Sequence, residues 1–249
     1  FLVDYPRFLV LFSAGDLASG GITPPGTAKN VLTVGASTTG AYGSTPEGNV
    51  ASSSSRGTTS DGRIKPDLVA PGISICSARA EEAILANGGE CSTSIHGDGQ
   101  TPLYMTLNGS SMATPVVAGA ATMIRQYLRQ VESISEPRSD LIRALLINGA
   151  KDLGASDIPN SAEGWGQLDL ENSLLPSNSG QDLNVIYDYS RDLLPGHSFV
   201  YTFEVNGNYG LDATIAWNDP EGSAVANQSA PRLVNDLDLK VISPTGTVY

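Results

Sequence analysis

The stretch from residue 107 to residue 119 constrains the fold and function of this chain most strongly; it reads Leu-Asn-Gly-Ser-Ser-Met-Ala-Thr-Pro-Val-Val-Ala-Gly. The Asn-Gly pair predicts a tight turn, and the apolar residues after it predict a helix from Met112 to Leu128. Pro115 would fall in the first helical turn, where its missing N–H breaks no helical bond. The helix is apolar or small on nearly every face before Arg125, so we expect it to be buried.

The two serines at the start of this helix have two interpretations. Ser110 and Ser111 are favourable N-cap residues, and the local pattern alone gives that role about equal weight. The alternative is that Ser111 is a nucleophile, because unpaired N–H groups at a helix N-terminus stabilise the negative charge that its attack creates. Small residues on the helix would let neighbouring backbone come close; they are Ala113, Ala118, Gly119, Ala120 and Ala121.

Residues 108–115 closely resemble the nucleophile motif of subtilisin-like serine proteases, with Ser in place of the usual Thr before the nucleophile. The resemblance implies that Ser111 is the nucleophile, that Asn108 to Ser110 form the turn that presents it, and that Asn108 and Gly109 help to bind substrate. Other stretches resemble the same family in the same order: 12–16, 54–57, 65–72 and 164–166. Residues 216–219 and 233–239 resemble the β-domain of the bacterial alkaline-protease branch.

This resemblance implies an α/β fold over residues 1–175, with a parallel sheet and helices on both faces. The residues agree with it, since continuous apolar runs at Phe8–Ser13 and Val31–Gly35 are typical of buried parallel strands. A short strand and turn are expected at 67–72 and a closing strand at 164–169. Apolar spacing predicts a helix at 139–148, with Asp140 in its first turn and Gly149 after its end.

A Pro/Ser/Asn/Gly-rich linker at 176–182 predicts a boundary, after which strands dominate. Alternating apolar and polar residues favour a half-buried antiparallel sheet. We therefore predict a second, jelly-roll-like all-β domain over residues 176–249, incomplete at its end. Its expected strands are 183–189, 198–204, 212–217 and 236–242.

In the family the catalytic residues come in the order Asp, His, Ser. The resemblance implies that the Asp and His precede Phe1 and that this chain is a fragment, inactive alone. The only histidines are His96, in a Gly/Asp loop, and His197, after a Pro-Gly pair in the β-region. Neither matches a family position for the general base.

The oxyanion hole departs from the family pattern at Asp16, where most relatives have Asn. An ionised Asp cannot donate a hydrogen bond to the oxyanion and would repel it. Two like charges about 4 Å apart at an effective dielectric of ~20 cost roughly 4 kcal/mol. A protonated Asp16 carries an O–H that could donate, so we expect activity that is slowed or shifted to acid pH. The resemblance also implies that Ser13, Ala14 and Gly15 form one wall of a pocket for a sizeable apolar or aromatic side chain.

Two function hypotheses follow. The first is a serine endopeptidase that hydrolyses peptide bonds through an acyl-enzyme on Ser111. The alternative, motivated by Asp16 and the missing triad residues, is a pseudoprotease that acts as a binding or scaffold protein. A further possibility is that the β-domain binds carbohydrate or a partner protein.

The net charge limits the classes of binding partner, and the cysteines bear on the cellular compartment. With Lys+Arg 14 against Asp+Glu 26, the net charge of −12 argues against nucleic-acid and anionic-membrane binding and leaves protein or peptide substrates. No apolar run reaches the length of a membrane span. Cys76 and Cys91 could form a disulfide that closes a surface loop, or remain free thiols. The family resemblance implies a secreted protein in an oxidising compartment.

Calcium is the only cofactor expected, and no organic cofactor is. Relatives often use calcium, and the β-region offers hard oxygen ligands near strand ends, although a solvated acidic loop is the simpler interpretation. The candidate ligands are Asn218, Asp219, Asn235, Asp236 and Asp238.

Overall fold

The structure is a computed structural model of residues 1–249. It describes residues 1–40, 47–83, 89–91, 103–154, 157–174, 188, 193–205, 211–223 and 229–249. The predicted linker at 176–182, most of the predicted strand at 183–189 and His96 lie outside the described residues.

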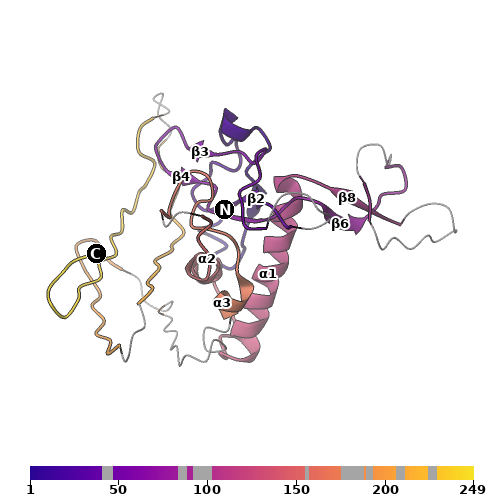
Figure 1. Ribbon diagram of the computed structural model, residues 1–249. Helices are drawn as coiled ribbons and strands as arrows, with labels where there is room; N and C mark the ends of the chain where they lie inside the picture. The colour runs from indigo at the N-terminus through magenta and orange to yellow at the C-terminus, as the bar shows by residue number, and fades with distance from the viewer. Residues whose placement is uncertain are drawn as a thin grey trace.

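A three-stranded parallel sheet forms the centre of the molecule (Figure 1). Its strands, in the spatial order β1-β2-β5, are β1 (Leu11–Ser13), β2 (Leu32–Ser37) and β5 (Leu68–Pro71). All six residues of β2 are buried, as expected for a central strand covered on both faces. The predicted parallel strands are therefore confirmed, although the first begins at Leu11 rather than Phe8.

Three helices share one apolar core with the sheet: α1 (Ser110–Gln130), α2 (Ser139–Asn148) and α3 (Leu170–Leu174). The bounds of α2 agree with the prediction, and Asp140 lies in its first turn. The long helix α1 packs against β1, β2 and β5 and is followed by α2. Its buried side chains recur every three or four residues and are Ser110, Ala113, Val117, Ala120, Ala121, Ile124 and Leu128.

The helix α1 is buried on one face only, so the prediction of a helix buried all round is wrong. Met123 is 51% exposed, and Gly119 is exposed with no atom within 4 Å of where a Cβ would sit. Close backbone approach therefore does not explain Gly119. The helix also begins two residues earlier than predicted, which makes Pro115 its sixth residue. Because Pro115 has no N–H, the Ser111 carbonyl lacks its usual i+4 donor.

The opposite face of the sheet is covered by loops in the described residues, so helices on both faces are not confirmed. The Thr33 hydroxyl donates to Gly26 O at 2.6 Å. A Cβ on Gly35 would lie 2.8 Å from Ser54 Oγ and 3.1 Å from Pro66. The segments that join the strands are rich in Gly, Ser and Pro, which favour turns over helices, so they lie across this face as loops.

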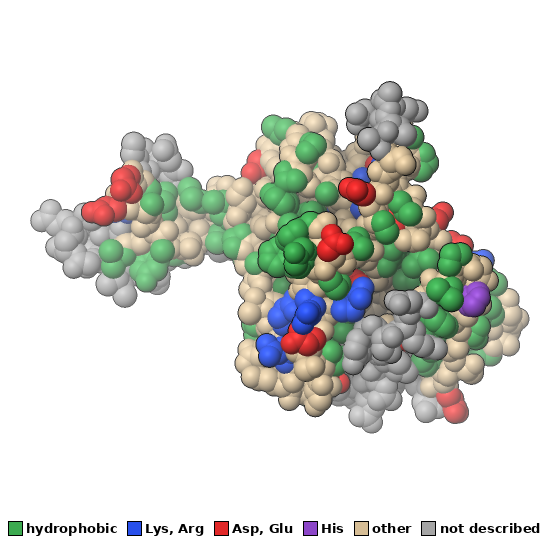
Figure 2. Space-filling view, turned by 180° about the vertical axis from the view of Figure 1, so that it is seen from behind, with side chains coloured by type: hydrophobic (Ala, Val, Ile, Leu, Met, Phe, Trp, Pro, Cys, Tyr) green, Lys and Arg blue, Asp and Glu red, His purple; other side chains and the backbone are tan. Residues whose placement is uncertain are grey.

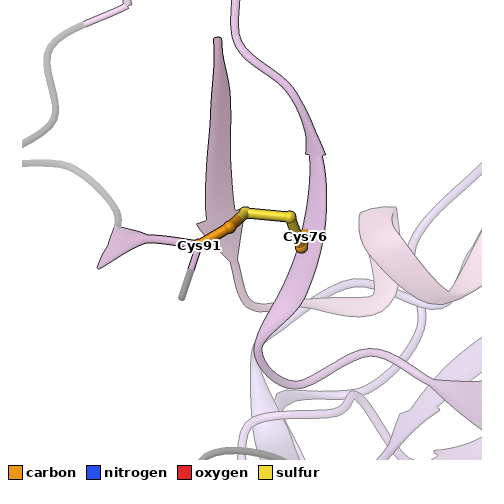
Figure 3. Close-up of a disulfide and its surroundings, with 2 residues drawn as sticks. All are labelled: Cys76 and Cys91. Atoms are coloured by element: carbon orange, nitrogen blue, oxygen red, sulfur yellow. A yellow bond between two sulfur atoms is a disulfide. The ribbon is translucent and has the colours of Figure 1, made fainter. Parts of the chain in front are cut away.

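An antiparallel arm projects from the body between β5 and α1 (Figure 1). It contains β6 (Ile75–Ala78), β7 (Gly89–Glu90) and β8 (Tyr104–Leu107), with β8 in the middle. Cys76 on β6 and Cys91 after β7 form a disulfide, which confirms the predicted pairing and excludes two free thiols (Figure 3). Figure 2 shows the arm extending from the body, with apolar side chains along it and acidic ones near its outer end. The strand β8 leads directly into the turn before α1.

Short elements complete the described fold: the 3-10 helix η1 (Ala18–Gly20) and a hairpin of β3 (Gly57–Thr58) and β4 (Ile64–Lys65). The predicted closing strand at 164–169 runs beside β5, where Gln167 forms a parallel bridge with Val69.

The region after residue 188 differs from its prediction. No strand is assigned at 198–204, 212–217 or 236–242, and the one pairing among these described residues is an isolated bridge between Ile242 and Val248. A strand needs a partner edge for its backbone groups, and alternation of side chains cannot supply one. The separate jelly-roll-like domain is thus not confirmed.

Candidate active site

Ser111 lies at the second position of α1, at the carboxyl ends of the parallel strands. Its side chain is exposed, and the preceding Gly109 is the N-cap with φ +140°. The first-turn N–H groups of a helix have no intrahelical partner, and the Ser111 N–H has no acceptor among the described residues. An exposed hydroxyl beside a free helical N–H is the arrangement that acyl transfer requires.

The first helical N–H is satisfied by a residue far away in the sequence. Ser110 N donates to Asp16 Oδ1 at 2.8 Å, so the carboxylate of Asp16 caps α1. The Ser110 hydroxyl is buried and accepts from Gly15 N at 3.1 Å. Ser110 and Ser111 are therefore not N-caps, and the N-cap interpretation of these serines is wrong.

Ser55 holds both sides of the Asp16 loop. Its hydroxyl accepts from Leu17 N at 3.0 Å, and its backbone N–H donates to Gly15 O at 2.9 Å. Ser55 is fully buried. The one sequence signal for this role is that residues 54–57 resemble a family segment. Ser55 is thus a positioning residue that the sequence did not reveal, and the predicted turn residue Ser110 has contacts with Gly15 and Asp16 that were not predicted.

Gly72 and Gly109 allow the turn before α1 to pass close to the end of β5. Gly109 N donates to Gly72 O at 2.8 Å, and a Cβ on Gly72 would lie 2.7 Å from Gly109 O. A Cβ on Gly109 would lie 2.8 Å from Asp16 Oδ2. Asn108, predicted to present the nucleophile, accepts from Ser74 N at 2.6 Å through its side-chain oxygen. This bond fixes the turn from the arm side.

A shallow pocket of roughly 350 Å³ opens beside the Ser111 hydroxyl. Ser13 lines it, as predicted, whereas the side chain of Ala14 is buried and the Gly15 N–H is engaged by Ser110. Of the three predicted wall residues, only Ser13 is therefore among the residues that line the pocket. The lining residues are Leu11, Phe12, Ser13, Ser111, Thr114 and Pro115.

A general base for Ser111 is not found among the described residues. His197 is exposed, and its backbone N–H closes a turn onto Leu194 O at 3.0 Å, which agrees with its predicted role as a turn residue.

Two of the five predicted calcium ligands, Asp219 and Asn218, already make hydrogen bonds to other groups. Asp219 is paired with Lys29 Nζ at 2.5 Å and accepts from the N–H groups of Val234 and Asn235. Asn218 donates to Ser139 Oγ at 3.1 Å. The other predicted ligands, Asn235, Asp236 and Asp238, are exposed. Calcium binding by this set stays a prediction, and Asp219 would have to exchange its present partners to take part.

A second cluster of carboxylate side chains, among the described residues, has the spacing of a metal site. Asp152, Asp157 and Glu163 each offer an oxygen within 4.8 Å of the others. Both Glu163 oxygens already accept hydrogen bonds, from Leu153 N at 2.9 Å and Asn160 Nδ2 at 2.8 Å. These bonds give Glu163 a structural role in the loop after α2.

Comparison with known proteins agrees with this geometry. Residues 4–166 match the model of the subtilase family. The chain belongs to the subtilase family. It is 32% identical over 254 residues to serine protease/ABC transporter B family protein tagB of Dictyostelium discoideum. The matched region covers 79% of this chain and 13% of tagB. Serine protease AprX of Bacillus subtilis is 37% identical over 153 residues, covering 61% of this chain and 31% of AprX.

The chain spans 11% to 13% of the length of tagB and its relatives tagA and tagD. Two solved protease structures also match. The prenylagaramide maturation protease PagA is 22% identical with a TM-score of 0.49, over 70% of this chain and 52% of PagA. The CspB protease of Clostridium perfringens is 26% identical with a TM-score of 0.46, over 61% of this chain and 27% of CspB. Among the described residues, no helix is both long and apolar enough to cross a membrane.

Proposed function

We propose that this chain carries the nucleophile of a serine endopeptidase. The observation that supports this most is the exposed Ser111 hydroxyl at the edge of a pocket, beside a Ser111 N–H that has no acceptor in the described part of the chain. Ser111 Oγ attacks the scissile carbonyl carbon and gives its proton to a histidine. The Ser111 N–H stabilises the resulting oxyanion; the histidine then gives the proton to the leaving nitrogen as the C–N bond breaks, and the amine leaves. Water hydrolyses the remaining ester.

The histidine and its orienting aspartate come from a polypeptide segment outside this chain. Family membership supports this, because the motif order places both residues before the oxyanion strand. Substrates are proteins or peptides, and the pocket beside Ser111 receives the side chain that precedes the cut. Its apolar lining by Leu11, Phe12 and Pro115 favours an apolar or aromatic side chain there.

The alternative function, a weakly active or inactive binding protein, is favoured by one observation. The Asp16 carboxylate accepts a hydrogen bond from Ser110 N, and an ionised carboxylate cannot donate to an oxyanion at the position where the family resemblance implies a donor. An inactive protein would keep the fold and the pocket and bind peptides without cleaving them.

Three further expectations belong to the same proposal. The disulfide between Cys76 and Cys91 supports secretion or another oxidising compartment. A β-domain over 176–249 and its calcium site remain predictions. Net charge −12 supports the absence of nucleic-acid and anionic-membrane partners.

A fluorophosphonate probe tests the proposal, because it reacts only with a serine that a base has activated. The protein to label is the chain joined to its preceding coding sequence, with the chain alone in parallel. Labelling that disappears in Ser111→Ala and persists in Ser77→Ala, an exposed serine on the arm, supports the endopeptidase. If the longer, folded protein is not labelled at any pH, the binding protein is the better proposal.

A further inference from the structure

The described residues in 214–223 and 229–235, called the C-terminal segment below, are joined to the α/β unit by a set of hydrogen bonds and an ion pair. This segment meets the loop before β2 and the helix α2, at the end of the sheet away from Ser111. In Figure 1 the C-terminal part, drawn orange to yellow, and the arm lie on opposite sides of α1. The contacting pairs are Lys29 with Asp219, Pro220 and Arg232, Asn30 with Asp219, Arg143 with Trp217, Ser139 with Asn218, and Asn148 with Thr214.

Lys29 is the centre of this contact. Its ammonium nitrogen lies 2.5 Å from Asp219 Oδ2, 2.6 Å from Pro220 O and 2.6 Å from Arg232 O. An ammonium group has three N–H donors, so three oxygens satisfy it completely. The side chain of Lys29 is 14% exposed and that of Asp219 is 3% exposed, so the pair is largely removed from water.

The Asp219 carboxylate has hydrogen-bond partners besides Lys29. Asp219 Oδ2 also accepts from Val234 N at 2.9 Å, and Asp219 Oδ1 accepts from Asn235 N at 2.8 Å. Burial alone would raise the pKa of Asp219, but hydrogen bonds from Lys29, Val234 and Asn235 outweigh it and lower that pKa below its usual value. The carboxylate is therefore fixed in its ionised form. One carboxylate and two carbonyl oxygens that converge on one point are the ligands a hard cation takes.

We propose that the Asp219 carboxylate and the carbonyl oxygens of Pro220 and Arg232 form a cation site, and that the Lys29 ammonium occupies it. The C-terminal segment thus supplies the oxygen ligands, and Lys29 of the α/β unit supplies the cation that they bind. The site takes a primary ammonium in the native protein and a small hard cation when the lysine is absent. This inference does not depend on the proposed protease activity.

Neighbouring contacts keep the segment in register with Lys29. The Asn30 side chain donates to Asp219 O at 2.8 Å and accepts from Asp219 N at 2.9 Å, as a peptide group would. Arg143 is buried and donates to the carbonyls of Trp217 and Asn30. Burial lowers the pKa of the Arg143 guanidinium, while Asp67 and Asp140 partly oppose this. Carbonyl oxygens of the segment are therefore the direct partners of two cations, Lys29 and Arg143.

Substitution of Lys29 tests the site on the full chain. Lys29→Ala empties it, and we expect Tm to fall by about 5 to 10 °C, because a buried carboxylate loses its partner. Methylammonium, Na⁺ or Ca²⁺ should then restore Tm with a saturable dependence on concentration. Lys29→Met fills the same space without charge, so no cation should restore it. Lys240→Met, which changes an exposed lysine, is the matched control and should behave as the wild type.

Two results would overturn the proposal. One is a Lys29→Ala protein with wild-type Tm; the other is a destabilised Lys29→Ala protein whose Tm responds to the three cations no more than that of Lys240→Met. If Lys29→Ala does not accumulate as folded protein, the titration is made on Lys29→Gln. A double-mutant cycle with Asp219→Asn gives an independent answer: the two effects should be strongly non-additive, and simple additivity would contradict the site.

Discussion

The carboxylate of Asp16 accepts a hydrogen bond from the backbone N–H of Ser110 at 2.8 Å, one residue before the proposed nucleophile Ser111. Ninety-four positions separate Asp16 and Ser110 in the chain. Asp16 therefore stabilises the N-terminus of α1. In the proposed endopeptidase Asp16 would also stand at the oxyanion-hole position, so stability and catalysis would impose different requirements on this one side chain.

Replacing Asp16 by Asn should raise activity in a protein that carries this chain together with its general base. Asn supplies an N–H donor and removes a negative charge beside the developing oxyanion. One oxyanion-hole donor is worth about 10²- to 10³-fold, but Asp16 is exposed and its charge is screened, so we expect kcat/KM to rise about 10- to 100-fold. Steady-state hydrolysis of a peptide substrate measures this, with Asp236→Asn as control. An unchanged kcat/KM would show that Asp16 does not act on the oxyanion.

Replacing Asp16 by Ala should destabilise the fold, whereas Asn should not. Ala removes the cap on Ser110 N, which costs about 1 kcal/mol of unfolding free energy, while Asn keeps a side-chain oxygen that can accept the same bond. Urea denaturation of the two variants and the wild type measures the difference. Equal stability of Asp16→Ala and wild type would mean that water replaces the cap at no cost.

The parts of this site that the sequence predicted are those encoded by neighbouring residues. The apolar spacing at 139–148 predicted the bounds of α2, and the buried runs before Ser13 and at Val31–Gly35 predicted parallel strands. The motif at 108–115 predicted the turn that places Ser111 at the start of α1, and the catalytic role of Ser111 stays a prediction. Each of these depends on a period or a turn that lies within a few residues.

The parts that the sequence did not predict depend on contacts between distant segments. The pairing of Asp16 with Ser110, the support of the Asp16 loop by Ser55 and the contact of Lys29 with Asp219 join residues 38 to 190 positions apart. Alternation over 198–204 predicted a strand, but no described segment pairs with it. A local pattern reports which side of a segment is apolar, and the tertiary structure decides what that side meets.

Two glycine substitutions should have opposite effects. Gly109→Ala places a Cβ 2.8 Å from Asp16 Oδ2 at φ +140°, so we expect a loss of about 2 kcal/mol or more and a loss of probe labelling. Gly119→Ala, in the exposed middle of α1, meets no atom within 4 Å and should stabilise the protein by about 0.5 to 1 kcal/mol. Chemical denaturation and fluorophosphonate labelling distinguish them. A tolerated Gly109→Ala would contradict the close approach of the Asp16 loop.

Loss of the disulfide should destabilise the arm. Cys76 and Cys91 are 15 positions apart, and a loop of that length contributes about 3 kcal/mol in the chain-entropy model. The double replacement Cys76→Ser with Cys91→Ser should therefore lower Tm, and a dithiol reductant should lower the Tm of the wild type toward the same value. The double variant is the control, because its Tm should not respond to the reductant. If the reductant shifts both proteins equally, its effect does not come from this bond.

Acid should remove a contribution that Asp61 makes to stability. The pKa of Asp61 is lowered from 3.8 to about 2, chiefly by a hydrogen bond from Arg63. A second hydrogen bond, from Thr59, acts in the same direction, and together they outweigh burial, which raises the pKa. Because the folded-state pKa is the lower one, the contribution is complete above about pH 4 and is lost as the pH falls toward 2; its size is about 2 kcal/mol. Asp61→Asn should therefore cost about that much at neutral pH, and its difference from wild type should shrink below about pH 4. Urea unfolding across this range measures the difference, and Asp212→Asn, at an exposed position, should show none of it. A difference that stays constant from neutral pH to pH 2 would assign the effect to packing rather than to the charge of Asp61.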